Sequence, residues 1–249
     1  MSSQPVLVVE HESQCPPGWM GEWLTDAGAK LDVRRPHAGD SLPENLTEHS
    51  GLVVLGGEMG AYDDALHPWL SDVKRLVQTA STGAEPVLGI CLGLQLAAVA
   101  LGGEVAPNSA GQQIGVLDVG WRTTAYDDPL LAVTARLPRS PAVQWNNDVV
   151  TRLPDGAELL AATPRGEIQA ARLAPNVWGV QWHPEAGEEI IRPWAEHDRD
   201  AAVERGVDLE RYVRDVADAR AELRVTWERL AVAFAGLCRA VPTRRTVGG

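Results

Sequence analysis

The chain has 249 residues, 45% of them hydrophobic, which is enough for one sizeable α/β core with an appendage. A formal net charge of -12 argues against a nucleic-acid partner and against binding to an anionic membrane surface. No apolar stretch approaches about 18 residues, which argues against a membrane span. Three cysteines without Cys-x-x-Cys spacing, and no basic-then-apolar leader, argue against a disulfide framework or a Cys-rich zinc site and predict a cytoplasmic protein.

Strand and helix signals alternate along the first hundred residues. Apolar, β-rich runs predict strands at 6–10, 31–33, 52–55 and 87–90. Apolar residues at helical spacing predict helices at 19–27 and 69–79, and a further helix follows the last strand at 94–101. This alternation predicts a doubly wound, mostly parallel sheet with helices on both faces, whose site lies beyond the carboxyl ends of the strands.

The second half of the chain has three parts. In residues 104–144 the apolar runs are shorter and β-like, so we expect a strand-rich excursion there. The core then resumes with a strand at 177–182. After Trp194 a charged stretch leads into an amphipathic helix that ends near Val241. This helix either packs on its own domain or binds a partner or a second copy. We therefore divide the chain into a main α/β domain, 1–195, and a C-terminal helical extension, 196–249.

Acidic pairs are weak signals. Asp63-Asp64 and Asp127-Asp128 could suggest a metal site, but such pairs in loops are usually solvated. We expect neither pair to bind a metal.

The segment Gly-Ile-Cys-Leu-Gly at 89–93 carries the strongest chemical signal. It lies between a predicted strand and a predicted helix, which is the setting of a nucleophile elbow. The side chain that this turn presents is the thiol of Cys91, at a helix N-terminus that favours the thiolate. The alternative is a buried, inert cysteine in a glycine-flanked turn. We interpret Cys91 as the nucleophile.

A base for Cys91 is predicted at the end of the strand 177–182. His183 precedes Pro184, which forces an extended conformation, so His183 and Glu185 tend to face the same side. A carboxylate beside an imidazole fixes its tautomer and stabilises the imidazolium. The other five histidines lack a carboxylate two residues on at a strand end. We therefore assign His183 as the base and Glu185 as its orienting group.

The apolar run 52–55 ends in Gly56-Gly57, whose amides are not shielded by side chains. In elbow enzymes one oxyanion-hole N–H belongs to the residue after the nucleophile and another to a different strand-end loop. Leu92 and Gly57 fit these two positions. An ordinary glycine turn is the alternative interpretation.

The segments LGGEMGAYD (55–63), GICLGLQL (89–96) and GVQWHPE (179–185), in this order, resemble the class I glutamine amidotransferases of the Cys-His-Glu type, and most of all their GMP synthase-like stand-alone glutaminase domains. The resemblance covers roughly residues 6–194 and implies a flavodoxin-like fold. It implies hydrolysis of the glutamine side-chain amide through a γ-glutamyl thioester on Cys91. It also implies that Gln95 and Gly56 contact the substrate. We expect no cofactor and no metal.

Three functions follow as hypotheses. The first is a glutaminase that passes ammonia to an acceptor on a separate synthetase subunit. The second is a stand-alone hydrolase of γ-glutamyl amides or peptides. The third is a non-catalytic regulatory relative, suggested by Glu58 where the family usually has proline, and by Asn146-Asn147 where close relatives have histidine and glycine.

Overall fold

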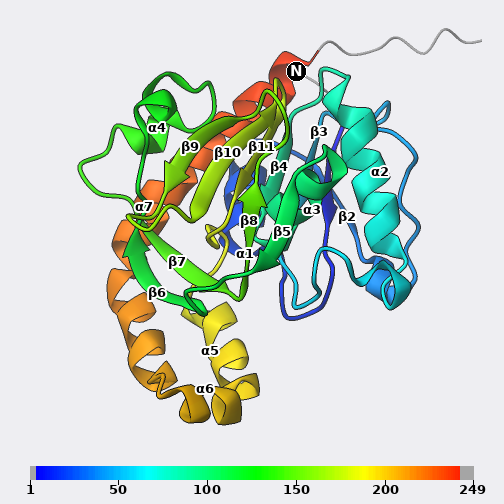
Figure 1. Cartoon of the computed structure of the whole chain (residues 1–249). Helices are drawn as coiled ribbons and strands as arrows, with labels where there is room; N and C mark the ends of the chain where they lie inside the picture. The colour runs from blue at the N-terminus through cyan, green and yellow to red at the C-terminus, as the bar shows by residue number, and fades with distance from the viewer. Residues whose placement is uncertain (1–3, 242–249) are drawn as a thin grey trace, which may run out of the picture.

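The computed structural model describes residues 4–241, and a seven-stranded sheet forms its centre (Figure 1). The strand order is β2-β1-β3-β4-β11-β10-β9, in which the first five strands are parallel and the last two antiparallel. The strands are β1 (Val6–Val9), β2 (Leu31–Arg34), β3 (Gly51–Val54), β4 (Val87–Ile90), β11 (Val177–Val180), β10 (Ile168–Ala174) and β9 (Glu158–Ala162). The predicted mostly parallel sheet is confirmed.

Helices cover both faces of this sheet. Helices α1 (Gly18–Asp26) and α7 (Leu209–Ala240) lie on one face, and α2 (Trp69–Ser81) and α3 (Leu92–Ala100) on the other. The chain also forms α4 (Ala132–Ala135), α5 (Glu188–His197) and α6 (Arg199–Arg205), and short 3₁₀ helices at Pro36–Ala38, Asp63–Ala65 and Thr123–Asp127. Successive side chains of a strand face opposite sides of a sheet. Accordingly, Val6 and Val8 belong to the core beneath α1 and α7, whereas Leu7 and Val9 belong to the core beneath α2 and α3.

The strand-rich excursion forms two ribbons outside the main sheet. Strand β5 (Glu104–Pro107) pairs with β8 (Asp148–Arg152), and β6 (Gln113–Asp118) pairs with β7 (Pro141–Asn146), both antiparallel. The region also contains the short helix α4, which the sequence did not indicate. Among residues 4–241, no helix combines the length and the apolar character that a membrane span requires.

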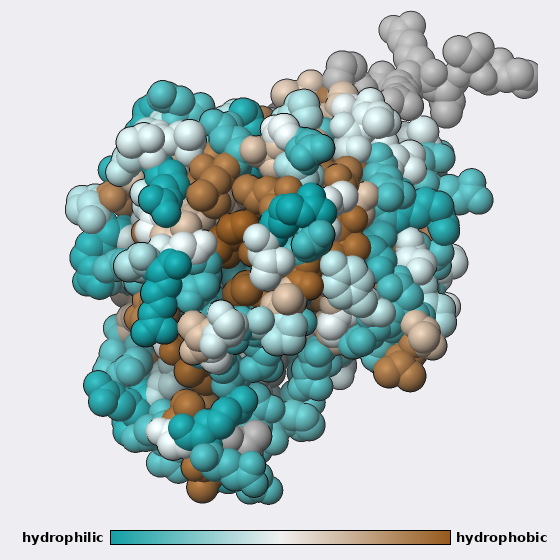
Figure 2. Space-filling model, in the orientation of Figure 1, coloured by the Kyte–Doolittle hydropathy of each residue, from teal (hydrophilic) through white to brown (hydrophobic). Residues whose placement is uncertain are grey.

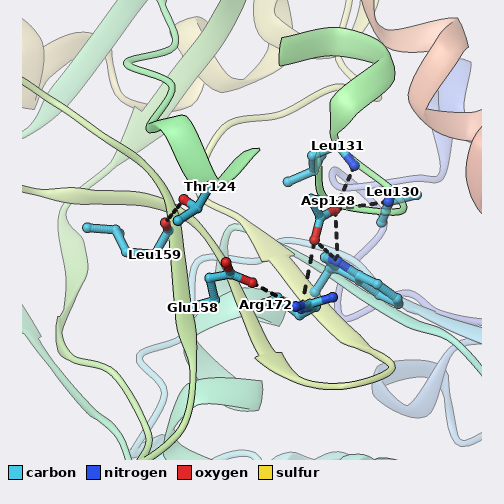
Figure 3. A network of polar contacts seen from close by, with 8 residues as sticks. Thr124, Asp128, Leu130, Leu131, Glu158, Leu159 and Arg172 are labelled. Atoms are coloured by element: carbon cyan, nitrogen blue, oxygen red, sulfur yellow. Dashed lines mark hydrogen bonds and ion pairs between the residues drawn. The ribbon is translucent and has the colours of Figure 1, made fainter. Parts of the chain in front are cut away.

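The expectation that Asp127-Asp128 is solvated is wrong for Asp128, which is 3% exposed. Its carboxylate accepts hydrogen bonds from the backbone N–H groups of Leu130 and Leu131 (2.9 and 2.8 Å) and from the indole N–H of Trp178 (Figure 3). Arg172 lies 3.8 Å away and also pairs with Glu158. These donors offset the free-energy cost of burying the carboxylate, and their contacts hold the α4 region against β10 and β11.

Helix α7 packs on its own domain, the first of the two arrangements expected for it. Trp227, Leu230 and Phe234 are fully buried in the core that also contains α1 and the sheet. The indole N–H of Trp227 donates to the backbone carbonyl of Pro141 (2.9 Å). Figure 2 shows hydrophilic groups around the margin of the visible face, apolar groups over its centre in front of the main sheet, and a smaller apolar group between α5 and α7.

The boundary between residues 195 and 196 stays a prediction. Helix α5 spans that boundary, and residues 242–249 of the expected extension lie outside the described part of the chain.

Replacing Phe234 with alanine tests how far the catalytic domain depends on α7. Phe234→Ala opens a cavity in the shared core, so the free energy of unfolding should fall by about 3–5 kcal/mol. Val232→Ala is the matched control on the exposed side of the same helix, because Val232 is 46% exposed; its effect should stay within about 0.5 kcal/mol. Urea unfolding curves measure both. Equal, small effects would show that the packing of α7 is dispensable.

Candidate active site

The carboxyl ends of the parallel strands β1, β3, β4 and β11 meet at one edge of the sheet. In the register of these strands, Val9 lies beside Val54, Val54 beside Gly89, and Ile90 beside Val180. The segments that follow these strands therefore converge around Cys91. They line a pocket of about 320 Å³.

A strained turn holds Cys91 at the end of β4. Its φ of 51° and ψ of −105° make it the one non-glycine residue with positive φ among residues 4–241. Such conformations cost on the order of 1–3 kcal/mol and persist only where their surroundings impose them. Here the Cys91 N–H donates to the Val180 carbonyl (2.8 Å), which ties the turn to β11.

The two glycines of the elbow are required by close backbone contacts. A Cβ at Gly89 would overlap the backbone of Gly93, and a Cβ at Gly93 would overlap the carbonyl oxygen of Val54 on β3. The helix α3 therefore begins directly against the sheet. As a result the Cys91 side chain emerges at the first turn of α3, where the unpaired N–H groups favour an anion.

His183 and Glu185 form a buried pair beside the thiol. His183 Nδ1 lies 2.7 Å from Glu185 Oε1, and the side chains are 3% and 1% exposed. Gly56 lies against both reacting residues, since a Cβ there would be 2.9 Å from His183 Cε1 and 3.6 Å from Cys91 Cβ. The structure thus brings together all three residues of the predicted triad.

The electrostatics of the pair favour a protonated imidazole. Burial alone would lower the pKa of His183, but the negative charges of Glu185 and Cys91, with hydrogen bonds to both, raise that pKa well above its ordinary value. A protonated His183 places a positive charge beside the Cys91 side chain.

Gly57 and Leu92, the predicted oxyanion-hole residues, are adjacent. A Cβ at Gly57 would lie 3.2 Å from Leu92 Cδ2 and 3.2 Å from His11 Cβ. Leu92 is the first residue of α3, so its N–H has no carbonyl partner within the helix. Behind this loop, burial and the nearby His37 and His67 lower the pKa of His11 to about 3, which keeps His11 neutral.

Glu58, the departure after Gly57, does not point its charge at this pair. Its backbone N–H donates to Glu12 Oε1 (2.9 Å), and its carboxylate lies 3.6 Å from His197 Nε2 at the end of α5. The charge therefore lies at the pocket mouth.

Gln95 lines the pocket from α3 and is tied in place by its amide. Its Nε2 donates to the Asp148 carbonyl (3.0 Å) and to Gln181 Oε1 (3.4 Å). Asn146, the second departure, donates to the same Asp148 carbonyl and to Gln113 Oε1. These bonds fix the wall formed by residues 145–148 against α3.

Several residues in and behind this pocket were not predicted from the sequence. Gln181, fully buried directly after β11, lies behind the pocket wall and donates from Nε2 to Cys91 Sγ (3.4 Å). An amide two residues before His183 in an otherwise apolar run was the available signal. The pocket-lining residues that were not predicted include Glu12, Cys15, Trp194, His197 and Asp198, which reach the pocket from the loop after β1 and from the end of α5. No local pattern marks them, because only the fold brings α5 to this edge.

The other two cysteines are poor nucleophiles. Burial, then Glu12, raises the pKa of Cys15, whose thiol donates to Glu12 Oε1 (3.1 Å). Burial raises the pKa of Cys238 to about 12. Both remain thiols at neutral pH.

The model of the class I glutamine amidotransferase family matches residues 22–191. The chain belongs to this family. The matched range includes the elbow and the His183–Glu185 segment.

Named relatives carry out different reactions of this family. The chain is 42% identical over 163 residues to one subunit of the glutamine-hydrolysing GMP synthase of Natronomonas pharaonis, and the match covers 58% of this chain and 86% of that protein. It is 28% identical over 199 residues to γ-glutamyl peptidase 5 of Arabidopsis thaliana, covering 77% and 75% of the two chains.

A glutamine amidotransferase from Thermotoga maritima has the same fold. Its crystal structure superposes with a TM-score of 0.83 at 25% sequence identity, over 94% of this chain and 99% of that one. The family fold therefore extends over almost the whole chain.

Proposed function

We propose that the protein hydrolyses the γ-amide bond of a γ-glutamyl compound through a thioester on Cys91. The buried Cys91–His183–Glu185 arrangement in a pocket, within a family of glutamine-hydrolysing enzymes, is the observation that supports this function most directly.

In the first step the Cys91 thiolate attacks the γ-carbonyl carbon and a C–S bond forms. The carbonyl oxygen becomes an oxyanion, which the N–H groups of Gly57 and Leu92 stabilise. When the oxyanion collapses, the C–N bond breaks, and the imidazolium of His183 gives its proton to the leaving nitrogen. The products of this step are a γ-glutamyl thioester, a neutral imidazole and a free amine.

In the second step a water molecule attacks the thioester. His183 takes one proton from this water, the C–S bond breaks, and glutamate leaves with a γ-carboxyl group that loses its remaining proton to solvent. The released thiolate and the protonated His183 restore the starting ion pair. Glu185 holds Nδ1 of His183 throughout and stabilises the imidazolium.

Glutamine is the smallest substrate of this kind, and its leaving group is ammonia. Gln95 and Gly56 are the residues we assign to contact the γ-glutamyl part. With glutamine as substrate, the ammonia would pass to an acceptor on a separate synthetase, as the likeness to one subunit of a GMP synthase suggests.

The second candidate is a stand-alone hydrolase that releases a larger amine and needs no partner. The further carboxylates that line the pocket favour it. The unsubstituted amide of glutamine has no group that extends to them, whereas a larger amine has one. The likeness to a γ-glutamyl peptidase supports the same reaction.

Hydrolysis by the purified protein tests the function. We expect glutamate release from glutamine or from a γ-glutamyl amide, and Cys91→Ala should reduce it to less than about a thousandth of the parent rate, because no nucleophile remains. Cys238→Ala removes a buried thiol far from the pocket and is the control that should keep the activity. Undiminished release by Cys91→Ala, with the fold checked by circular dichroism, would refute the assignment.

His183→Ala and Glu185→Gln separate the roles of the two supporting residues. The first should lower the acylation rate by about 10²–10⁴-fold because no acid or base remains. The second should have a smaller effect, since Glu185 orients and stabilises but transfers no proton. Single-turnover release of the amine measures both rates. If acylation by Glu185→Gln were slower than acylation by His183→Ala, the two roles would be misassigned.

A further inference from the structure

The lining of the Cys91 pocket is acidic. Four carboxylates line the pocket: Glu12, Glu58, Asp148 and Asp198. None of the described residues that line it is a lysine or an arginine, and the basic groups there are His183 and His197. Several like charges around one cavity concentrate a negative potential inside it.

The direction of the leaving group follows from the chemistry. His183 must reach the leaving nitrogen to protonate it, so a substituent on that nitrogen lies on the His183 side of the pocket. Trp194 packs edge-on against His183, with ring centroids 4.9 Å apart, and belongs to α5. His197 and Asp198 follow one turn later at the end of this helix. A substituent on the nitrogen therefore extends along α5 toward Glu58 and Asp198.

The carboxylates at this end lack sufficient cationic partners. Burial, then the charges of Glu12 and Asp198, raise the pKa of Glu58, and only His197 acts in the opposite direction. The Glu58–His197 contact is a loose one, 3.6 Å long between side chains that are 62% and 58% exposed. A cation placed between Glu58 and Asp198 would relieve their repulsion.

Aromatic rings line the path to these carboxylates. Trp145 and Trp194 both line the pocket and meet edge to face at 5.8 Å. The Trp194 indole N–H donates to the Gln14 carbonyl (2.8 Å), which fixes this ring. Tryptophan faces together with carboxylates are suited to a substituted ammonium group.

We propose that the substrate is a γ-glutamyl amide of a cationic amine, such as a diamine acylated at one end, and that Glu58 and Asp198 select it. This inference rests on the proposed function. The amide nitrogen lies at Cys91 and His183, and the distal ammonium lies between the two carboxylates. A neutral amine gains nothing there, and an amine that carries a carboxylate is repelled.

Three substrates of similar length test this selection: the γ-glutamyl amides of putrescine, pentylamine and γ-aminobutyrate, whose distal groups are cationic, neutral and anionic. For the parent protein we expect kcat/KM to be about tenfold higher for the cationic than for the neutral amide, and lowest for the anionic one. Raising the salt concentration should shrink this preference, because part of the site is exposed.

Glu58→Gln and Asp198→Asn should each lower the ratio of cationic to neutral kcat/KM several-fold. Glu48→Gln is the control for net charge. It removes an exposed carboxylate that precedes the first residue of β3, at the end of the strand away from the pocket, and it should leave the ratio unchanged. Because the ratio compares two substrates on one protein, a partly unfolded variant does not distort it, and two separate variants guard against one that fails to fold.

The outcomes separate the two proposals. Equal, Cys91-dependent hydrolysis of the three amides would overturn the substrate class and leave the proposed function intact. A preference that Glu48→Gln reduces as much as Glu58→Gln would also overturn it, because net charge would then suffice. No Cys91-dependent hydrolysis of any amide or of glutamine would overturn both proposals.

Discussion

The strained backbone at Cys91 is the constraint on which the rest of the site depends. A residue with positive φ between β4 and α3 is stable only because Gly89 and Gly93 let the first turn of the helix press against the sheet, and because the Cys91 N–H is held by Val180. This contact sets where the thiol lies and which N–H groups surround it. The positions of His183 and Gly56 follow, since both segments end neighbouring strands.

The same architecture explains why the site tolerates so much buried polarity. His183, Glu185 and Gln181 are all nearly inaccessible to solvent, which would be costly if they lacked partners. The His183–Glu185 contact and the amide of Gln181 meet much of this need. Two apolar cores, one beneath α2 and α3 and one beneath α1 and α7, hold the sheet that positions these groups.

Local features of the fold and the site could be predicted from the sequence, whereas features that depend on long-range contacts could not. Strand 87–90, the elbow and the His-Pro-Glu segment were predictable, because each is encoded by neighbouring residues. The antiparallel strands β9 and β10, the buried Asp128 and the approach of α5 to the pocket were not. Each depends on partners distant in the sequence. Asp128, for example, accepts a hydrogen bond from the indole N–H of Trp178 and lies 3.8 Å from Arg172, both far along the chain.

The reactivity of the three thiols tests the central claim, that the fold activates Cys91 alone. A diazoketone analogue of glutamine is incubated with the native protein, and peptide mapping by mass spectrometry locates the adduct. We predict one adduct, on Cys91, which excess γ-glutamyl substrate prevents, while Cys15 and Cys238 remain unmodified because burial raises the pKa of each. Modification of Cys15 or Cys238 in preference to Cys91, or labelling that substrate does not slow, would contradict the account.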